Sequence, residues 1–268
     1  MAHARLTGTA WDRKREDYAY TRDLDKSGWA WEFLRRNETF QRDYILSGDA
    51  SPSPNPHTSG TSCYFALEAD LLAGKWGLLC FPDYKKSAVE IDVFWQPALR
   101  SSHLRLRINA NDGESDDCLA LADFNCRRAM LRQNGIEHVT IQDRTESVHL
   151  TIYDGSLLDA PCHVTFEIDG MARVNSGISA MQTLVKLRQK DGSDAWNSMM
   201  RDGKYFDYLV ALDGRLAGRT YRDIAEVLYG TDRIGPYWTD DSRGYKSKVR
   251  RAVERGLALM NGGYCELL

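Results

Sequence analysis

The chain has 268 residues, which is long enough for two domains, and its balance of apolar and charged residues is that of a folded protein. Its net charge of −3 at pH 7 argues against a protein that coats nucleic acid through bulk charge, so any DNA contact must come from a local basic surface. No apolar run reaches the roughly 18 residues of a membrane span, and no signal-peptide core follows residues 1–5. We therefore expect a cytoplasmic protein with no membrane partner.

Residues 1–26 are charged and poor in aliphatic side chains, but they contain large aromatic residues that we expect to pack on the first helix: Trp11, Tyr18 and Tyr20. That helix is predicted to begin near Ser27, a candidate N-cap, and Asn37 would weaken it. Its apolar residues are Trp29, Phe33, Leu34 and Phe40. Residues 1–48 are thus predicted to form a helical N-terminal domain.

A proline-rich run follows this helical segment. Pro52, Pro54 and Pro56 occupy alternate positions, which excludes a helix and favours an extended, semi-rigid connector. Serine and asparagine fill the positions between them. We predict a Pro/Ser-rich linker over residues 49–62, and it is the clearest domain boundary in the sequence.

The hydrophobic period changes to two residues over the middle of the chain, which is typical of half-buried strands. The alternating segments are residues 88–94, 103–108, 148–153 and 163–168. Turn signals containing Asn-Gly or Asp-Gly separate them, at residues 111–113, 134–135 and 154–155. We predict a small, mainly antiparallel sheet over residues 63–170, with a short helix over residues 120–132 packed on one face.

The helical period returns after residue 172. An apolar stripe there predicts a helix that ends before residues 191–193, and its members are Val174, Ile178, Met181 and Val185. A further helix over residues 194–200 is predicted to lead into the C-terminal module. Residues 171–268 are therefore predicted to be all-helical, so that the fold class of the chain is α+β.

Two short helices are predicted next. The apolar face of the first is Tyr205, Leu209, Leu212 and Leu216, and Gly218 ends it. Thr220 is a good N-cap for the second, and the carboxylate of Asp223 can reach back to the free amides of the first turn, as in a capping box. Its apolar face is Tyr221, Ile224, Ala225 and Leu228, and Gly230 follows where a left-handed C-terminal residue is favoured.

A third helix is predicted to begin at residues 240–242, which offer N-cap groups. At about 100° per residue, one face of this helix is apolar: Tyr245, Val249, Val253, Gly256 and Met260. The opposite face carries Arg243, Ser247, Arg250 and Arg251, with Lys246, Lys248 and Arg255 on its flanks. A basic face is therefore expected to remain exposed.

This arrangement meets the requirements of a helix-turn-helix DNA-binding domain, in which the third helix buries one face and presents the other to the major groove. The connection between the last two helices is unusual. It ordinarily has about three or four residues. Here residues 231–241 intervene, and they include Tyr237 and Trp238.

Several runs of the C-terminal region closely resemble the C-terminal domain of the FseA and QseM proteins, the excision activator and its antiactivator in integrative and conjugative elements of proteobacteria. These runs are residues 209–218, 221–230, 249–251 and 259–264. Residues 29–37 and 42–44 resemble the transcriptional-regulator-like domain that precedes this module in FseA-type activators and that QseM-type proteins lack. The whole chain therefore resembles the activator.

The resemblance implies a variant helix-turn-helix with a lengthened connection, preceded by a strand-rich region. It also implies a transcriptional activator that controls excision and transfer genes of a mobile conjugative element. The implied partners are double-stranded promoter DNA, an antiactivator protein of the same family and RNA polymerase. The N-terminal helix has two readings: a small aromatic core with solvated Arg35, Arg36 and Arg42, or a contact surface for DNA or the transcription machinery.

The residues that would carry DNA binding follow from the helical positions. Arg243, Ser247, Arg250 and Arg251 would face the groove, and the contacts to phosphates would come from Arg219, Arg222, Lys246, Lys248 and Arg255. Thr220 would add a phosphate contact at the helix N-terminus. Lys and Arg on an exposed helix face are usually only solubilising, and the resemblance favours the DNA-binding role.

The alternative is a protein-interaction module with no DNA contact of its own, either antiactivator-like or recruiting a partner. The slightly acidic net charge is compatible with this role. The partner would be bound through the exposed aromatic residues Tyr237 and Trp238 or through the outer surface of the third helix, and the N-terminal Trp29 and Trp31 are further candidates. The strand-rich middle remains open as either a ligand sensor or a spacer.

The sequence contains no pattern of an active site. The six cysteines include no Cys-x-x-Cys pair and are expected to be reduced and mostly buried. No two of the six histidines stand at the i, i+4 spacing of a zinc hydrolase, and residues 114–117 are expected to be a solvated acidic loop. A Walker loop and a Gly-x-Ser-x-Gly elbow are absent from the sequence. We expect no enzyme activity, metal or cofactor.

Overall fold

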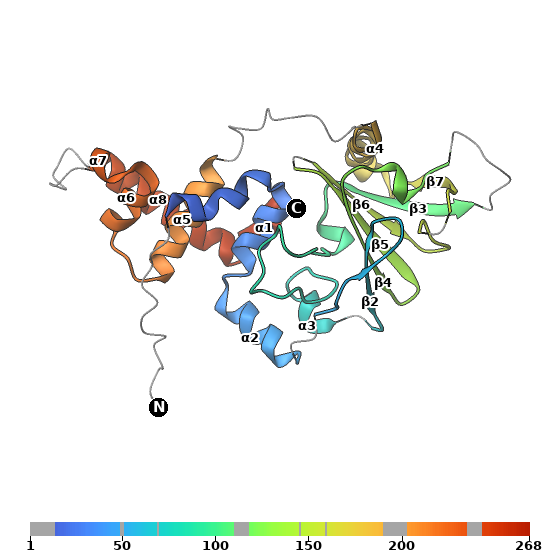
Figure 1. Ribbon diagram of the computed structural model, residues 1–268, viewed down its shortest axis with the longest axis horizontal. Coiled ribbons are helices and arrows are strands. Elements are labelled where there is room, and N and C mark those ends of the chain that lie inside the picture. The colour runs from blue at the N-terminus through green and yellow to red at the C-terminus, as the bar shows by residue number, and fades with distance from the viewer. Residues whose placement is uncertain are drawn as a thin grey trace.

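The computed structural model places helices from both ends of the chain together, beside a β-sheet formed by the middle (Figure 1). The α+β class is confirmed. The structure describes residues 14–48, 51–68, 70–109, 118–144, 146–158, 160–189, 203–234 and 243–268. The predicted turn at 111–113, the helix at 194–200 and the start of the third C-terminal helix at 240–242 lie outside the described residues.

The N-terminal region contains η1 (Arg15–Asp23), α1 (Lys26–Leu34) and α2 (Glu38–Leu46). The predicted helix begins one residue before Ser27, but it ends at Leu34, and Phe40 lies on the separate helix α2. Asp25, not Ser27, caps α1, since its Oδ1 accepts from the Gly28 amide at 2.8 Å. Asn37 ends the first helix and caps the second by accepting from the amides of Thr39 and Phe40, which is the side-chain chemistry that makes Asn unfavourable inside a helix.

The described strands form one seven-stranded sheet of order β1-β2-β4-β5-β6-β3-β7. The strands are β1 (Asn55–Pro56), β2 (Ser62–Ala66), β3 (His103–Asn109), β4 (Arg127–Gln133), β5 (Ile136–Gln142), β6 (Ser147–Ile152) and β7 (His163–Glu167). The pairs β2–β4 and β3–β6 are parallel and the others antiparallel, so the sheet is mixed. The predicted turn between β4 and β5 is confirmed, with Asn134 and Gly135 both at positive φ.

Two predictions in this region were wrong. Residues 88–94 form no strand, because the guanidinium of Arg127 donates to the carbonyl oxygens of Ala88 and Val89 in place of a neighbouring strand. Residues 120–132 form no helix but the short turn η3 (Leu121–Asp123) and then β4. Both faces of β4 are buried, with Met130 in one core and Leu131 in another, so its sequence shows no two-residue alternation.

The short helices α3 (Leu71–Gly74) and η2 (Pro97–Leu99) lie on the segment between β2 and β3, and η4 (Met171–Arg173) leads into α4 (Val174–Gln189). Helix α4 packs on one face of the sheet. Of the predicted stripe, Met181 packs against this core, but Ile178 and Val185 are about half exposed. The residues buried against the sheet are Gly177, Ala180, Leu184 and Leu187. The small side chains at 177 and 180 let the helix approach closely, since a Cβ on Gly177 would stand 3.0 Å from Ile168.

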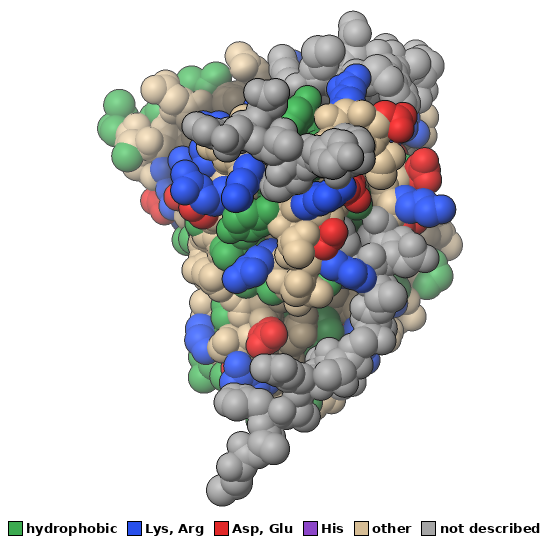
Figure 2. All heavy atoms as spheres, turned by 90° about the vertical axis from the view of Figure 1, so that its left-hand side faces the viewer, with side chains coloured by type: hydrophobic (Ala, Val, Ile, Leu, Met, Phe, Trp, Pro, Cys, Tyr) green, Lys and Arg blue, Asp and Glu red, His purple; other side chains and the backbone are tan. Residues whose placement is uncertain are grey.

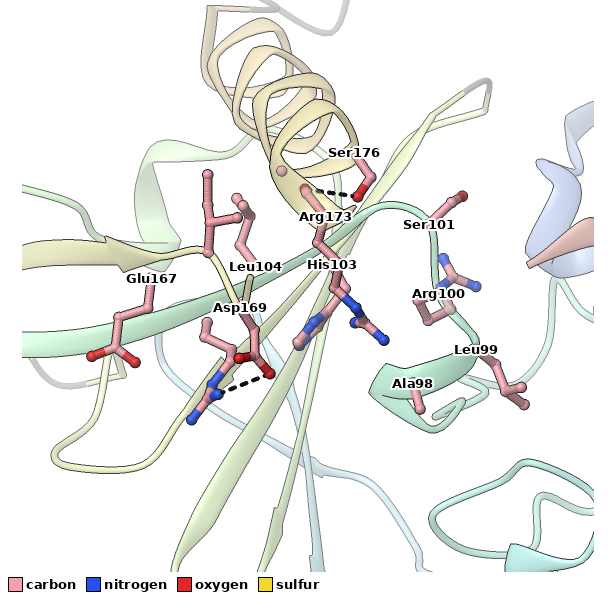
Figure 3. Close-up of a pocket in the computed structure, with 13 residues that line it drawn as sticks. Ala98, Leu99, Arg100, Ser101, His103, Leu104, Glu167, Asp169, Arg173 and Ser176 are labelled. Atoms are coloured by element: carbon pink, nitrogen blue, oxygen red, sulfur yellow. Dashed lines mark hydrogen bonds and ion pairs between the residues drawn. The ribbon is translucent and has the colours of Figure 1, made fainter. Parts of the chain in front are cut away.

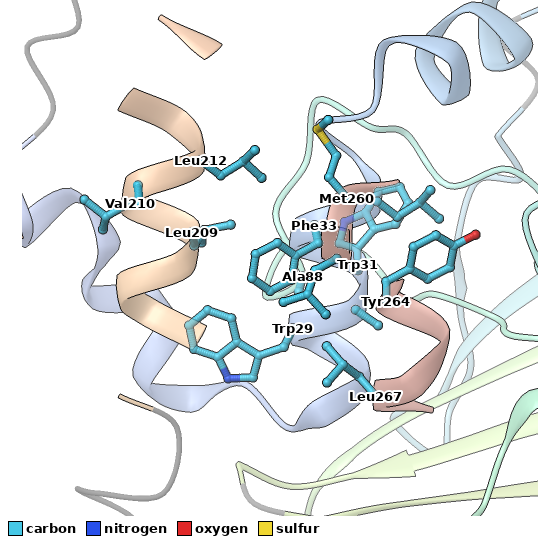
Figure 4. Packing of buried hydrophobic residues seen from close by; sticks show 14 of the residues in the cluster. Trp29, Trp31, Phe33, Ala88, Leu209, Val210, Leu212, Met260, Tyr264 and Leu267 are labelled. Atoms are coloured by element: carbon cyan, nitrogen blue, oxygen red, sulfur yellow. The ribbon is translucent and has the colours of Figure 1, made fainter. Parts of the chain in front are cut away.

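The C-terminal region contains α5 (Gly203–Leu216), α6 (Tyr221–Tyr229), α7 (Thr231–Ile234), α8 (Arg243–Met260) and η6 (Gly263–Leu267). These helices share one apolar core with the N-terminal helices (Figure 4). Trp29 of α1 lies 5.8 Å from Tyr205 of α5, measured between ring centres, and Trp95 lies 5.7 Å from Tyr264 of η6. Segments predicted as separate domains, 1–48 and 171–268, therefore bury each other's apolar faces. The domain limits themselves stay a prediction.

None of the six cysteines, all of which lie in the described part of the chain, forms a disulfide. Three of them, Cys63, Cys80 and Cys118, are buried, and the other three are partly exposed. Among the described residues, no helix is long and apolar enough to cross a bilayer. No group of three or more His, Cys, Asp or Glu side chains within the described ranges is arranged to hold a metal ion.

Candidate nucleic-acid interface

Local hydrogen bonds fix the bounds of α5 and α6. Gly218 has φ +72° and ends the turn after α5, as predicted. The Oγ1 of Thr220 accepts from the Asp223 amide at 3.2 Å, and the carboxylate of Asp223 accepts from the Thr220 amide at 3.0 Å, so the predicted capping box is confirmed. Gly230 ends α6 at φ +90°, and α7 begins at the next residue.

Helix α8 buries the face that the sequence predicts. Val249, Ala252, Val253 and Gly256 lie against α5 and α6. A Cβ on Gly256 would stand 2.6 Å from the carbonyl oxygen of Tyr208 and 3.0 Å from Cβ of Leu212, so the backbones of α5 and α8 meet at this glycine. This close crossing fixes the rotation of α8, and with it the direction of its opposite face.

That opposite face is basic. Residues 243–260 include six Lys or Arg side chains and one acidic side chain, Glu254, in a chain whose net charge is −3. Five of the six are exposed, namely Lys246, Lys248, Arg250, Arg251 and Arg255. Figure 2 shows Lys and Arg side chains spread over the end of the molecule formed by the C-terminal helices, with a few acidic ones among them. The side chain of Arg243, at the start of α8, lies outside the described residues.

The intrahelical ion pairs neutralise only part of this charge. Arg250 lies 3.8 Å from Glu254, and both side chains are more than half exposed, so the pair contributes about 0–1 kcal/mol. The ammonium group of Lys248 lies 5.6 Å from the ring centre of Tyr245, and Arg251 Nε donates to the carbonyl oxygen of Ser247 at 3.4 Å. These contacts order the basic side chains and leave their charge available to an anionic partner.

A groove of about 780 Å³ runs beside α8 and is bounded by α5 and α6. Its basic residues are Lys204 of α5 and Lys248, Arg251 and Arg255 of α8. Asp207, Tyr208, Tyr229 and Glu254 complete most of the wall. Three predicted DNA contacts, Lys248, Arg251 and Arg255, are thus brought together with a fourth cation.

Sequence reasoning missed Lys204, Tyr208 and Tyr229 in this groove. Lys204 is the second residue of α5, and only the apolar stripe of that helix was used in the prediction. A single exposed lysine does not by itself indicate a DNA contact. The ring of Tyr229 lies 5.0 Å from that of Tyr245, centre to centre, which joins α6 to α8. Burial, with the nearby charge of Asp207, raises the pKa of the Tyr229 hydroxyl, so it remains a neutral donor at pH 7.

The predicted contacts at the start of α6 lie apart from this groove. Arg219, Thr220 and Arg222 stand at its N-terminal end, whereas Tyr229, which lines the groove, is the last residue of the helix. Arg222 forms an ion pair with Glu226 on the same helix at 3.0 Å. Thr220 is exposed, and Arg219 and Arg222 are partly exposed.

Two of the four predicted partner-binding residues offer no surface, which corrects that prediction. Trp29 is 2% exposed and Trp31 is fully buried, because both fill the core shared by the N-terminal and C-terminal helices. The indole nitrogen of Trp31 donates to the Lys86 carbonyl oxygen at 3.1 Å. The other two, Tyr237 and Trp238, lie outside the described residues.

A buried ionic network attaches α5 to the N-terminal helices. Arg36 holds both carboxylate oxygens of Asp213, with Nη2 to Oδ2 at 3.0 Å, and Nη1 donates to Glu32 at 2.7 Å. Burial alone would raise the pKa of Glu32, but the charges of Arg36 and Arg35 outweigh it and hold the pKa below its ordinary value. Burial opposes the charge on Arg36, yet Asp213 and Glu32 raise the pKa of that guanidinium. Arg36 is thus structural, not a solvated arginine.

The 3-10 helix η1 also supports the C-terminal helices. Arg15 Nη1 donates to the carbonyl oxygen of Leu228 at 2.7 Å, and its guanidinium lies 4.9 Å from the centre of the Phe206 ring. The hydroxyl of Tyr18 donates to Asp213 at 2.9 Å. The N-terminal region therefore contacts both α5 and α6, and it supports the two helices against which α8 packs.

Two family models match the ends of the chain. Residues 169–268 match the family described as "T6SS, Transcription factor, DNA binding domain", and residues 11–82 match the "Proteobacterial transcriptional regulator-like domain". Both descriptions concern DNA binding or regulation and neither names an enzyme, so they support a DNA-binding regulator. A comparison with curated proteins finds no match. Neither description names excision or conjugation, so the likeness to FseA-type activators stays a prediction.

Proposed function

We propose that this protein regulates transcription by binding duplex promoter DNA through the exposed face of α8. The observation that carries the proposal is the concentration of basic side chains on one helix of a chain with net negative charge. A helix of this kind fits the major groove of B-DNA, which is about 12 Å wide. The match of residues 169–268 to a DNA-binding family supports the same conclusion.

Position on α8 divides its residues into two sets. By their helical positions, Arg243, Ser247 and Arg250 would reach base edges, where an arginine forms two hydrogen bonds to guanine. Lys248, Arg251 and Arg255 surround the groove with Lys204 and would hold phosphates, with Lys246 on the other flank. The N-terminus of α6, with Arg219, Thr220 and Arg222, would bind a phosphate of the flanking DNA.

The regulated genes are a narrower proposal. The resemblance to FseA favours activation of the excision and transfer genes of a conjugative element, with an antiactivator and RNA polymerase as protein partners. The family description of residues 169–268 instead favours type VI secretion genes. Both classes of promoter belong in the first binding test.

The test is fluorescence anisotropy with promoter duplexes and a random duplex at about 50 and 200 mM salt. Arg250→Ala should weaken binding by about 1–3 kcal/mol at one base position and leave the affinity for random DNA nearly unchanged. Lys248→Ala should weaken binding to every duplex and reduce the slope of log K against log salt by about one. Lys186→Ala, at an exposed position of α4 far from α8 in the sequence, is the matched control and should have no effect.

The protein-interaction alternative makes a different prediction. If the wild-type protein binds no duplex at either salt concentration, the DNA-binding proposal fails and the protein acts through a partner. Equal losses on promoter and random DNA for Arg250→Ala would instead remove the base-contact assignment. Tyr237 and Trp238 would then be the first residues to replace in a partner-capture assay.

A further inference from the structure

A cavity of about 270 Å³ lies in the strand-rich region, where η2, β3, the end of β7 and the start of α4 meet (Figure 3). Three arginines line it: Arg100 before β3, Arg105 on β3 and Arg173 at the end of η4, directly before α4. It does not involve α5 to α8, so its chemistry is separate from the proposed DNA contacts.

Arg100 is the most informative residue of the cavity. Its side chain is buried, with 7% of the residue exposed, and Nη2 donates to Nε2 of His149 and to Oγ of Ser147. The buried Nε and Nη1 hydrogens have no acceptor, and Arg100 forms no ion pair with any described residue. Burial lowers its pKa to about 10, against the opposing charge of Asp25, so the guanidinium is still charged at pH 7. A buried charge with open donors is costly unless an anion completes it.

The other two arginines add to this positive charge. Arg105 also has a buried Nε without an acceptor, and its Nη1 lies 3.6 Å from Asp169, whose side chain is 74% exposed. Arg173 is exposed at the wall of the cavity and forms no ion pair with the described residues. Of the two lining carboxylates, Glu167 is already held by Arg107 at 2.9 Å. The cavity is therefore lined by more guanidinium groups than carboxylates that could pair with them.

The pKa of His103, which lies between Arg100 and Arg105 in the sequence, is lowered in part by the charges of the same three arginines. Burial lowers its pKa to about 4, and the charges of Arg173, His138, Arg105 and Arg100 act in the same direction. A neutral imidazole at pH 7 adds no charge and accepts or donates one hydrogen bond to Thr151 at 2.9 Å.

We propose that this cavity binds a small anion that carries a phosphate or carboxylate group. Arg100 would supply positive charge from its buried end, and Arg105 and Arg173 would close on the anion from β3 and η4. Pockets that bind drug-sized ligands have volumes of about 300–1,000 Å³. The cavity of about 270 Å³ is slightly smaller, so it suits a small metabolite or the charged end of a larger one. The strand-rich region would then be a ligand-binding region rather than a spacer.

The test is calorimetric titration of the full chain with inorganic phosphate and, separately, with succinate, at constant ionic strength. Binding of either probe by wild-type protein is expected, and the stronger of the two identifies the anionic group. Arg105→Gln and Arg173→Gln should each weaken that binding about tenfold, since a charged hydrogen bond is lost. Lys186→Gln removes one charge from the other end of α4 and should change nothing.

Arg100→Gln should abolish binding, and its circular dichroism and melting temperature report whether it folds. The exposed position of Arg173 keeps the test decisive if that variant fails to fold. The proposal is overturned if wild-type protein binds neither probe at about 10 mM, or if Arg105→Gln and Arg173→Gln bind as well as wild type. It is also overturned if Lys186→Gln weakens binding as much as Arg105→Gln and Arg173→Gln do, because the net charge of the protein would then account for the measured binding heat.

Discussion

Gly256 is the residue on which the orientation of the basic helix depends. Alanine normally stabilises a helix relative to glycine by up to about 1 kcal/mol, so a glycine inside α8 needs a reason. The reason is space, because the Tyr208 carbonyl of α5 occupies the position that a Cβ would take. A backbone carbonyl cannot move aside as the end of a flexible side chain can, and steric overlap therefore outweighs helix propensity.

Gly256→Ala should lower the free energy of unfolding by about 1–3 kcal/mol through overpacking, and it should also weaken DNA binding by turning α8. Gly244, in the first turn of the same helix, has no atom within 4 Å of the position of a Cβ. Gly244→Ala is therefore the control and should raise stability by up to about 1 kcal/mol. Urea denaturation of both variants measures the difference. Equal changes in the free energy of unfolding for Gly256→Ala and Gly244→Ala would contradict the proposal that the close crossing of α5 and α8 requires a glycine at position 256.

At the scale of elements, α1 and α5 are joined by charge as well as by apolar contact. Glu32 is fully buried, and its carboxylate accepts from Arg35, Arg36, Tyr20 and the Ala88 amide. Its pKa is lower in the folded state than its ordinary value of 4.5, since Arg36 and Arg35 outweigh the effect of burial. The stability it contributes is therefore fully present above pH 4.5 and is lost as the pH falls through the lower, folded value.

Glu32→Gln should lower the free energy of unfolding at pH 7 by about 3–5 kcal/mol, because it leaves the buried Arg36 with one carboxylate fewer. Below pH 4.5 the difference between variant and wild type should shrink, as the wild-type carboxylate becomes protonated. Glu226→Gln breaks the Arg222 pair on α6 and should cost about 0–1 kcal/mol at any pH. Chemical denaturation across this range of pH is the measurement. A constant difference between Glu32→Gln and wild type would disprove the assignment.

At the scale of the whole molecule, the two ends of the chain complete one folded unit. Asn37 donates to the Met260 carbonyl oxygen at 3.2 Å, Tyr264 to that of Trp76 at 3.0 Å, and the Ser101 amide to that of Leu268 at 2.8 Å. With the aromatic contacts around Trp29, these bonds attach the C-terminal helices to the N-terminal helices and to the segment between β2 and β3. Helix α8 therefore rests on a scaffold built from both matched regions.

A fragment of residues 169–268 should consequently be much less stable than the full chain. The apolar surface that α1 and η1 cover would be exposed, and we expect binding of a hydrophobic dye and loss of a cooperative melting transition. Comparison with the chain from residue 14 onward, which retains these contacts, isolates the effect. A fragment that melts cooperatively and binds DNA as tightly as the full chain would show that the shared core is dispensable.

The sequence by itself determined the elements whose signals are local. Helices α5 and α6 follow from their apolar spacing, their glycines and the Thr220–Asp223 capping box, and the basic face of α8 follows from helical geometry alone. Three of the four predicted strand segments are also present, because alternation along a half-buried strand is read within a few residues. The DNA-binding role rests on these local features together with the family matches.

Only the tertiary structure decided which apolar faces are covered and by what. It places Trp29 and Trp31 in a core shared with residues nearly two hundred positions away. It buries Gly177, Ala180, Leu184 and Leu187 of α4 against the sheet. Where a strand was predicted at residues 88–94, the Ala88 carbonyl oxygen instead accepts from Arg127. It also places Lys204 of α5 in one groove with the basic residues of α8, and it places Arg100 and Arg173 on the wall of one cavity. Burial and charge depend on neighbours that are distant along the chain, and a single sequence contains no record of those neighbours.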